Sequence, residues 1–506
     1  MTSGRPAPAR DRERPMRFAP ILRALAIGVV GAALVARVAF DRDADGVWRW
    51  DDCDDGRSAV HPGAPDVPRN GEDEDCDGRD SQRGTNVVLL TIDTLRPRNL
   101  HVYGYRRETS PVIDQLAADG ALFEHAYSTS SWTLPSLASL MTSKHPIEHG
   151  TVTGRVGLPD HLVTITHVLR AAGYDTAAWT QSAYPLYRLG FGREFQVTEK
   201  PAGAQIPDVV KWLHQHTERP FFLWVHLAEP HTPYLPTKRF EAHFTRKRAN
   251  ANKDLARWWN ADECVRFYET EPKDTDLRLT FYDETIRESD FKIGEILGAI
   301  DELGMRDRTV VALTADHGEE FFEHRGCDHG QTLYDEVLHI PLLMRHPPTI
   351  EPGVRVEEQV RLLDVAPTIL DLITLPAHPD FVGRSLRAHT EGRGHDLPVI
   401  GGYMSNAEPA IVFRKHGLKY IYSPRRSALR TRHASRPTEE LYDVEADPLE
   451  RRDLAPKGHP RLEQLRAKAK KWSTRQPFNP APQVNYDKTT VQRLKALGYL
   501  GDDPVK

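Results

Sequence analysis

The sequence has few long apolar runs and only four cysteines, and neither sign of charge is in large excess. The mean hydropathy is −0.54, and 39% of the 506 residues are hydrophobic. These values exclude a multi-span membrane protein, and the apolar content is too high for a disordered chain. No basic domain is present, so nucleic acid is not expected as a partner. The length predicts a core-forming body of two to three domains.

The formal net charge of −5 is unevenly distributed along the chain. Residues 1–40 carry seven Arg against two acids, for +5, and residues 41–80 carry fourteen acids against five Arg, for −9. The remaining 426 residues therefore sum to −1. A nearly neutral body thus follows a basic head, residues 1–17, and an acidic neck, residues 41–85.

One apolar segment, residues 18–40, lies between the head and the neck. Its centre, Ala24–Ala36, has no polar side chain and is bracketed by Arg23 and Arg37. Arginines before an apolar stretch are typical of an export signal, and this segment is long enough to span a bilayer if both arginines snorkel. No clear cleavage site follows. The segment predicts an exported cell-envelope protein, anchored in the membrane with its body outside the cytoplasm, or secreted. A buried helix of a cytosolic protein is the alternative.

The neck contains regularly spaced aspartates and two of the four cysteines. Two D-x-D-x-D-G repeats match the EF-hand style of calcium loop, and so many carboxylates repel one another unless cations neutralise them. Calcium is therefore predicted here, with a solvated acidic linker as the alternative. Cys53 and Cys76 fall one in each repeat, which predicts a disulfide, whereas Cys264 and Cys327 show no pairing pattern. The neck resembles the Asp- and Cys-rich metal-binding motif of secreted bacterial proteins. The candidate calcium ligands are Asp41, Asp43, Asp45, Asp52, Asp73, Asp75 and Asp77.

From Asn86 onward, apolar runs alternate with amphipathic helical stretches. This pattern predicts an α/β fold with a mostly parallel central sheet flanked by helices. We expect a main domain at 86–395, a smaller C-terminal α+β subdomain at 396–475 and a tail at 476–506. The expected strands are 86–92, 176–180, 221–227, 309–315, 339–344, 410–414 and 418–422. The expected helices lie near 110–120, 135–143, 206–217, 274–303, 364–373 and 459–472.

Three of the expected strands are followed by carboxylates and imidazoles. Ligands bind beyond the carboxyl ends of strands in open α/β sheets, so we expect these side chains to form one site. Asp316-His317 is a compact pair of metal ligands, and Asp93 could complete it. The polar residues that follow the three strands are Asp93, then Glu229 and His231, then Asp316, His317 and Glu319.

The segment 128–143 supplies an oxygen nucleophile for such a site. Thr133 precedes Pro135, and proline is favoured in the first turn of a helix. The Thr133 hydroxyl would then lie at the positive end of the helix dipole, where an anionic tetrahedral group is stabilised. Ser130, Ser131 and Ser136 are close enough in sequence to compete with it.

Several motifs together resemble the sulfatase family of the alkaline-phosphatase superfamily. They follow the family's order and cover nearly the whole chain from residue 86. The resemblance implies a metal-dependent esterase fold with a four-stranded C-terminal subdomain. The motifs include NVVLLTIDTLRPRNLHVYGY, SWTLPSLASLMTSKHPIEHG, HLAEPHTPY, TADHGEEFFEHRGCDHGQTLYDEVLHIPLLMR and LYDVEADPLERRDL.

The resemblance also implies roles for individual residues. Three metal ligands would bind a divalent cation, either Mn, Mg, Zn or Ca, and Thr133 occupies the nucleophile position. His231 matches a histidine that contacts a substrate oxygen or protonates the leaving group. His329 matches a position where the family places a Lys or His against the anion. The implied ligands are Asp93, Asp316 and His317.

The departures from the family pattern bear on the chemistry. The C-x-P-S-R motif, whose first residue becomes formylglycine, here begins with Thr133 and ends with Leu137. No formylglycine is therefore expected. The Lys and His of a G-K-W-H segment are missing at 180–183, and Thr94 replaces the second of two aspartates. A hydrated aldehyde lets sulfate leave by elimination, whereas a threonine ester of sulfate would be stable.

A threonine alkoxide suits phosphoryl transfer better, as in the related lipoteichoic acid synthases and phosphoethanolamine transferases. The sequence thus predicts a hydrolase or transferase acting on a sulfuric or phosphoric ester, carried by a polysaccharide, lipid or cell-envelope glycan. Phosphoryl chemistry through Thr133 is favoured mechanistically. Sulfate-ester hydrolysis without formylglycine and a catalytically silent surface-binding module are the alternatives.

Overall fold

The protein is described by a computed structural model, which divides into two units at residues 1–82 and 83–506. In the first unit Cys53 and Cys76 form a disulfide, with Cα atoms 6.0 Å apart, as predicted. Cys327 in the second unit is also disulfide-bonded, for which the sequence offered no basis. The described residues are 41–43, 46–58, 60–62, 73, 76, 84–182, 184, 186–199, 205–244, 275–404, 408–423, 438–473 and 483–496.

The prediction of a membrane anchor requires correction. The segment at 18–40 on which it rested lies outside the described residues. Among the helices that the structure does describe, none combines the length and the apolar character needed to cross a bilayer. Membrane anchoring of an exported body is therefore unsupported, and the prediction is withdrawn.

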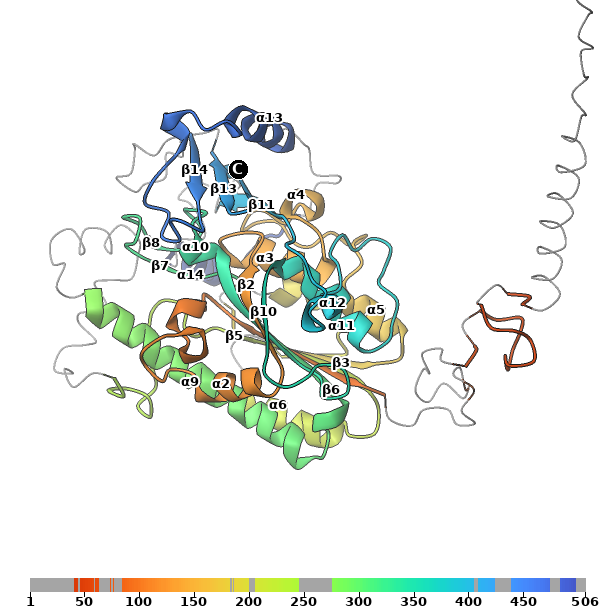
Figure 1. Cartoon of the computed structure of the whole chain (residues 1–506). Helices are drawn as coiled ribbons and strands as arrows, with labels where there is room; N and C mark the ends of the chain where they lie inside the picture. Colours follow the sequence, from red (N-terminus) through yellow and green to blue (C-terminus); the bar gives the residue numbers. More distant parts are fainter. Residues whose placement is uncertain are drawn as a thin grey trace, which may run out of the picture. The chain divides into compact units, whose positions relative to one another are not determined.

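An eight-stranded sheet forms the centre of the second unit, in the order β10-β2-β9-β6-β1-β5-β3-β4 (Figure 1). The neighbouring strands are parallel, except that β9 runs antiparallel to both β2 and β6. The predicted α/β class with a mostly parallel sheet is confirmed. The strands are β1 (Asn86–Ile92), β2 (Ala121–Tyr127), β3 (Asp175–Thr180), β4 (Val197–Glu199), β5 (Phe221–Leu227), β6 (Thr309–Ala315), β9 (His339–Arg345) and β10 (Val354–Arg361).

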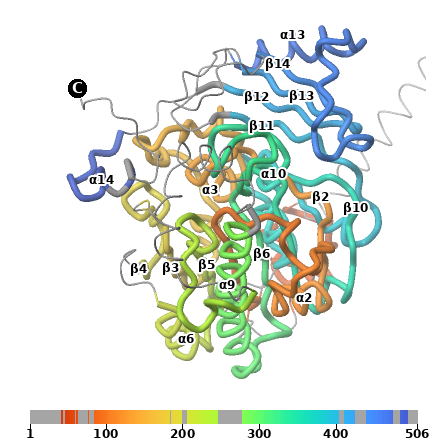
Figure 2. Tube along the Cα trace, turned by 90° about the vertical axis from the view of Figure 1, so that its left-hand side faces the viewer, coloured from red at the N-terminus to blue at the C-terminus, as the bar shows by residue number. Residues whose placement is uncertain are grey.

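Helices cover both faces of this sheet, which explains the continuous apolar sequences of its central strands. Every residue of β1, β5 and β6 is buried, as expected for strands packed on both sides. One group of helices lies over one face and the other group over the opposite face (Figures 1 and 2). The first group is α2 (Pro111–Ala118), α6 (Ile206–Gln215) and α9 (Thr275–Glu302), and the second is α3 (Thr133–Thr142), α5 (Ile165–Ala171) and α11 (Val365–Leu372).

A second sheet, β11-β12-β13-β14, is antiparallel throughout and forms the smaller C-terminal part of the unit (Figure 2). Helix α13 (Leu462–Ser473) packs on it. An apolar cluster that includes Tyr127, Val337, Val412 and Ile421 joins this sheet to β2 and to α10 (Asp335–Leu338) of the main body. The strands are β11 (Val399–Met404), β12 (Glu408–Lys415), β13 (Leu418–Tyr422) and β14 (Glu439–Asp443).

Candidate functional site

The three strands whose ends carry the candidate site residues are neighbours in the sheet. Ile92 of β1 pairs with Leu227 of β5 on one side and with Ala315 of β6 on the other. The three strands are parallel and end at the same level, so the residues that follow them share one edge of the sheet. Asp93 comes next after β1, and Asp316 comes next after β6.

Asp93, Asp316 and His317 form a compact buried group. One ligand atom from each lies within 4.8 Å of the others, and no other such group of three is found in the described part of the chain. Nε2 of His317 lies 3.5 Å from Oδ1 of Asp93 and 3.4 Å from Oδ2 of Asp316. The structure therefore brings together the three residues that the sequence nominated as metal ligands.

The hydrogen bonding of this group fits a bound cation. Among the described residues, Asp93 Oδ1 and Asp316 Oδ2 are buried without a hydrogen-bond partner. Nδ1 of His317 lies 2.8 Å from the Gly318 carbonyl oxygen, to which it donates its proton, so the Nε2 lone pair faces the carboxylates. Three electron-rich atoms thus face one another, an arrangement that a divalent metal stabilises and that is costly without one.

The pKa directions reflect the same crowding. Burial opposes the ionisation of Asp93, but the imidazoles of His231, His226 and His317 outweigh it and hold its pKa below the usual range. Burial and the nearby Asp93 charge raise the pKa of Asp316 well above the ordinary carboxylate value. Burial lowers the pKa of His317, which keeps its imidazole neutral as a ligand must be.

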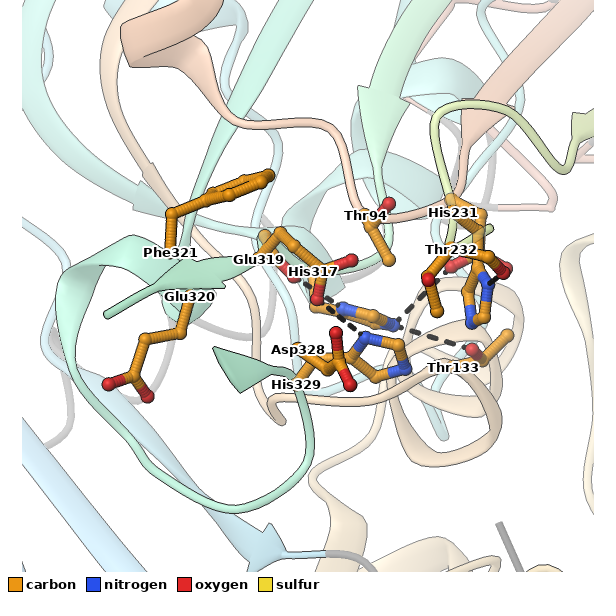
Figure 3. A network of polar contacts seen from close by, with 12 residues as sticks. Thr94, Thr133, His231, Thr232, His317, Glu319, Glu320, Phe321, Asp328 and His329 are labelled. Carbon is orange, nitrogen blue, oxygen red and sulfur yellow. Dashed lines mark hydrogen bonds and ion pairs between the residues drawn. The ribbon is translucent and has the colours of Figure 1, made fainter. Parts of the chain in front are cut away.

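Thr133 is the first residue of α3, and its side chain is fully buried. Its Oγ1 lies 3.3 Å from Nε2 of His317 (Figure 3). Of the competing hydroxyls, Ser136 Oγ lies within 3.0 Å of both Ser128 Oγ and the Ser130 carbonyl oxygen, so it is engaged away from this group. Among the described residues, Thr133 is the hydroxyl beside the ligand atom of His317, whereas Ser128 Oγ donates to the backbone carbonyl of Asp316 at 2.6 Å.

Two further imidazoles lie at the same site (Figure 3). The ring centroid of His329 is 4.4 Å from that of His317 and 4.9 Å from that of His231. His231 follows β5, and its Nδ1 lies 2.5 Å from the Thr232 carbonyl oxygen. Although burial disfavours the charged form of His329, the adjacent Glu319 carboxylate raises its pKa above the ordinary value.

Sequence reasoning missed His226 and did not give Glu319 a role. His226 Nε2 lies 3.7 Å from Asp93 Oδ2, and Nδ1 contacts the Thr91 hydroxyl at 2.9 Å. A usable signal was present, because His226 is the single ionisable residue in the otherwise apolar strand β5. Glu319 lies two residues beyond His317 and contacts His329, a relation that only the fold reveals.

Only part of the predicted calcium neck can be placed. Asp45, Asp75 and Asp77 lie outside the described residues, while Asp41, Asp43, Asp52 and Asp73 lie within them. Asp41 Oδ2 accepts a hydrogen bond from the Gly46 amide at 3.2 Å, as in a metal-binding loop. In the described part of the neck, Asp41 Oδ1 and Asp52 Oδ2 are buried without a hydrogen-bond partner. Calcium binding here stays a prediction.

Comparison with protein families gives three matches. The model described as "Sulfatase" matches residues 85–375, more than half of the chain. The model "N-sulphoglucosamine sulphohydrolase, C-terminal" matches residues 322–474. The model "Putative metal-binding motif" matches residues 52–81 of the neck.

Curated proteins similar to the chain are named as sulfatases. An ulvan-active sulfatase from Formosa agariphila is 24% identical over 408 residues, covering 73% of this chain and 76% of its own length. Arylsulfatase K from Mus musculus is 26% identical over 357 residues. This match covers 60% of the chain and spans 63% of the length of the mouse protein.

Solved structures share the fold. One, a protein in complex with its substrate D-glucosamine-2-N,6-O-disulfate, is 18% identical with a TM-score of 0.61, covering 77% of this chain and 98% of that one. The phosphonate monoester hydrolase of Agrobacterium radiobacter is 20% identical, also with a TM-score of 0.61, and the match covers 77% of this chain and 95% of that one. Proteins that share this fold thus differ in the ester named for them.

Proposed function

This chain belongs to the sulfatase family of hydrolases, and from that premise we propose that it hydrolyses sulfate esters at the group formed by Asp93, Asp316 and His317. One observation carries the proposal. Two buried carboxylate oxygens without hydrogen-bond partners in the described structure face an imidazole nitrogen that lies 3.3 Å from the Thr133 hydroxyl. A candidate cation site and a candidate nucleophilic oxygen are thereby adjacent among buried side chains.

Each side chain of the site has its own role in the proposed reaction. Asp93, Asp316 and His317 would hold a divalent cation, which supplies polarisation of the ester and lowers the pKa of a neighbouring hydroxyl. Thr133 attacks the sulfur from the first turn of α3, where the helix dipole favours an anion, and the alcohol leaves with a proton from His231. Water then attacks the sulfur of the sulfothreonine and frees the Thr133 hydroxyl, which is the slow step for a sulfate ester. His231 and His329 approach from the other side and donate hydrogen bonds to ester oxygens. Because Asp93, Thr133, Asp316 and His317 are buried, water is limited at these groups and their contacts with the ester are strengthened.

A phosphoric ester is the second candidate, and the identity of residue 133 favours it. Threonine cannot form the hydrated aldehyde that expels sulfate by elimination, and Leu137 replaces the arginine of the modification motif. A phosphothreonine is attacked at phosphorus by water more readily than a sulfothreonine is attacked at sulfur. The likeness of the fold to a phosphonate monoester hydrolase is compatible with this candidate.

We further propose that a saccharide carries the ester. The names of two similar proteins support this, since one is active on ulvan and the other binds a glucosamine disulfate. In this chain no fixed cation of a G-K-W-H segment is available at 180–183. The anion would therefore be held by imidazoles and by the cation at the carboxylates.

The test is a substrate panel measured with the full chain. The protein is stripped with a chelator, reloaded separately with Mn, Mg, Zn or Ca, and offered p-nitrophenyl sulfate, bis-p-nitrophenyl phosphate and a phosphonate monoester. We expect turnover that depends on the metal. If p-nitrophenyl sulfate is the one substrate hydrolysed, a phosphoric ester is ruled out as the substrate. Turnover of the phosphorus esters alone would overturn the first candidate. Metal binding without any turnover would support a silent binding module.

A further inference from the structure

Glu319 is a buried carboxylate with a different kind of partner on each oxygen. Its side chain is fully buried. Oε1 lies 2.8 Å from Nδ1 of His329, and Oε2 accepts a hydrogen bond from the Tyr234 hydroxyl at 3.0 Å. The backbone carbonyl of Glu319 accepts a further hydrogen bond from Arg96 at 3.0 Å. The carboxylate is thus held on both of its oxygens, and the backbone that carries it is held by Arg96.

The same contacts continue into a closed ring. Arg278 of α9, also buried, donates to the Tyr234 hydroxyl at 3.3 Å and pairs with the carboxylate of Asp328. Asp328 precedes His329 in the chain, so this network of contacts closes at the imidazole of His329. Three separate segments, the residues after β5, helix α9 and the loop after β6, are therefore linked to His329 through Glu319 and Asp328. The positive charge of Arg278 is paired with Asp328 inside this network.

This network of contacts determines which nitrogen of His329 faces the site. Because Nδ1 is directed at Glu319, Nε2 is the nitrogen on the opposite side of the imidazole. Figure 3 shows the ring of His329 lying between Glu319 and Thr133, alongside His317. We propose that Glu319 is a positioning residue, which fixes the orientation of His329 so that its Nε2–H donates a hydrogen bond to an oxygen of the bound ester. This inference rests on the proposed function of the site.

A carboxylate is well suited to this task. It accepts a hydrogen bond from Nδ1–H and so prevents the ring from rotating to place Nδ1 in the site. Partners of this kind typically change activity by about 10–100-fold when they are removed, although they never touch the substrate. A simple structural role for Glu319 would instead brace the 319–329 loop, and its loss would act on stability.

A double-mutant cycle separates these two roles. Glu319→Gln keeps the size of the side chain but removes the carboxylate from Nδ1, and we expect kcat/KM to fall roughly 30-fold. In the His329→Ala background the same substitution should have almost no effect, since Glu319 acts through His329. Equal losses in both backgrounds would overturn the proposal.

A matched control lies in the same loop. Glu323 pairs with Arg96 at 2.6 Å, and within the described part of the chain it forms no hydrogen bond or ion pair with His329. Glu323→Gln also removes a carboxylate from an ion pair, so we expect it to lower the Tm but to change kcat/KM by less than about threefold. A loss in Glu323→Gln as large as that in Glu319→Gln would indicate a structural role for the whole loop.

A second measurement does not depend on turnover. In protein labelled with ¹⁵N-histidine, the His329 nitrogens report which of them carries a proton. We expect a proton on both nitrogens in the wild type, since Nδ1–H donates to Glu319 while Nε2–H faces the site, and loss of the Nδ1 proton in Glu319→Gln. An unchanged pattern in the variant would overturn the proposal. If no ester is turned over at all, the proposed function fails while this readout still decides the orienting role.

Discussion

Oγ1 of Thr133 lies 3.3 Å from Nε2 of His317, and both side chains are fully buried. The two residues are 184 positions apart in the chain. They meet because α3 begins at the edge of the sheet where β6 ends. The proposed nucleophile and a proposed metal ligand thus lie side by side among buried side chains.

Replacing Thr133 tests whether this hydroxyl is the nucleophile. Thr133→Ala should abolish turnover, because no other hydroxyl among the described residues lies within hydrogen-bond distance of His317 Nε2. Metal affinity, measured by calorimetry, should stay within about tenfold, since the three proposed ligands are untouched. Thr133→Ser keeps a hydroxyl and should retain activity, and it serves as the matched control. Full activity in Thr133→Ala would move the nucleophile to another residue.

Asp316→Asn should separate metal binding from folding. Asp316 Oδ1 accepts hydrogen bonds from the amides of His317 and Thr94, at 2.9 and 3.3 Å, and an asparagine oxygen can keep both. The asparagine NH₂ then replaces Oδ2, the atom that crowds Asp93. In chelator the variant should therefore melt at or above the wild-type Tm, because a like-charge contact is gone.

With added metal, the wild type should have a higher Tm than Asp316→Asn. A cation at about 100 times its Kd stabilises the wild type by roughly 2.7 kcal/mol, and the variant should gain much less because one ligand is lost. Thermal melts with and without Mn, Zn or Ca measure both effects. An equal rise of Tm in the two proteins would contradict the assignment of Asp316 as a ligand.

His324 should make stability depend on pH in the alkaline range. Burial disfavours its charge, but Glu336, 2.6 Å from Nδ1, raises the pKa of His324 to about 9. A folded-state pKa above the unfolded value stabilises the protein below the unfolded pKa, and this contribution is lost as the pH rises through 9. Relative to wild type, His324→Gln should lose about 2 kcal/mol of unfolding free energy near pH 6 and almost nothing above pH 10.

Urea unfolding at a series of pH values measures this difference. Glu336→Gln should show the same pH window, because it removes the partner that raises the pKa of His324. A difference between His324→Gln and wild type that is constant from pH 6 to pH 10 would show that the ion pair does not form.

The neck offers a separate prediction about calcium. Asp52→Asn should remove one calcium ion per chain, because Asp52 Oδ2 is buried without a partner in the described part of the neck. Trp48 and Trp50, which are 53% and 62% exposed, report the binding by fluorescence. Asp51→Asn changes the neighbouring exposed carboxylate and should leave the stoichiometry unaltered. An equal loss in both variants would indicate diffuse attraction by an acidic surface.

The central strands and the residues at their ends could be predicted from the sequence. β1, β5 and β6 are wholly buried, so their apolar runs stand out, and Asp93 and Asp316 follow them directly. β2 and β10 were missed because polar side chains interrupt them. The direction of β9 was also beyond the sequence, since an apolar run does not distinguish a parallel from an antiparallel strand.

Contacts between distant side chains were less accessible. The sequence could place Glu319 after β6 but could not show that it contacts His329 across a turn of the loop. Arg278 lies within the long helix α9, where a charged residue is normally solvated, and its burial follows from tertiary packing alone. Pairings of this kind depend on how segments meet, and no local pattern encodes that.

Lys419 tests how the C-terminal sheet is attached to the body that carries the site. This lysine on β13 is fully buried and lies 2.6 Å from Asp335 and 2.8 Å from Glu450. Lys419→Met should cost roughly 3–5 kcal/mol, because it removes the cation that two buried carboxylates share and leaves Arg414, 3.5 Å from Asp335, as the remaining partner of that carboxylate. Adding Glu450→Gln should recover part of that loss, since one of the two negative charges is then removed. Denaturant unfolding of the single and double variants measures the coupling. Strictly additive losses would mean that Lys419 stabilises the sheet by packing, and that Asp335, which begins α10 after the loop bearing His329, is held in place by other contacts.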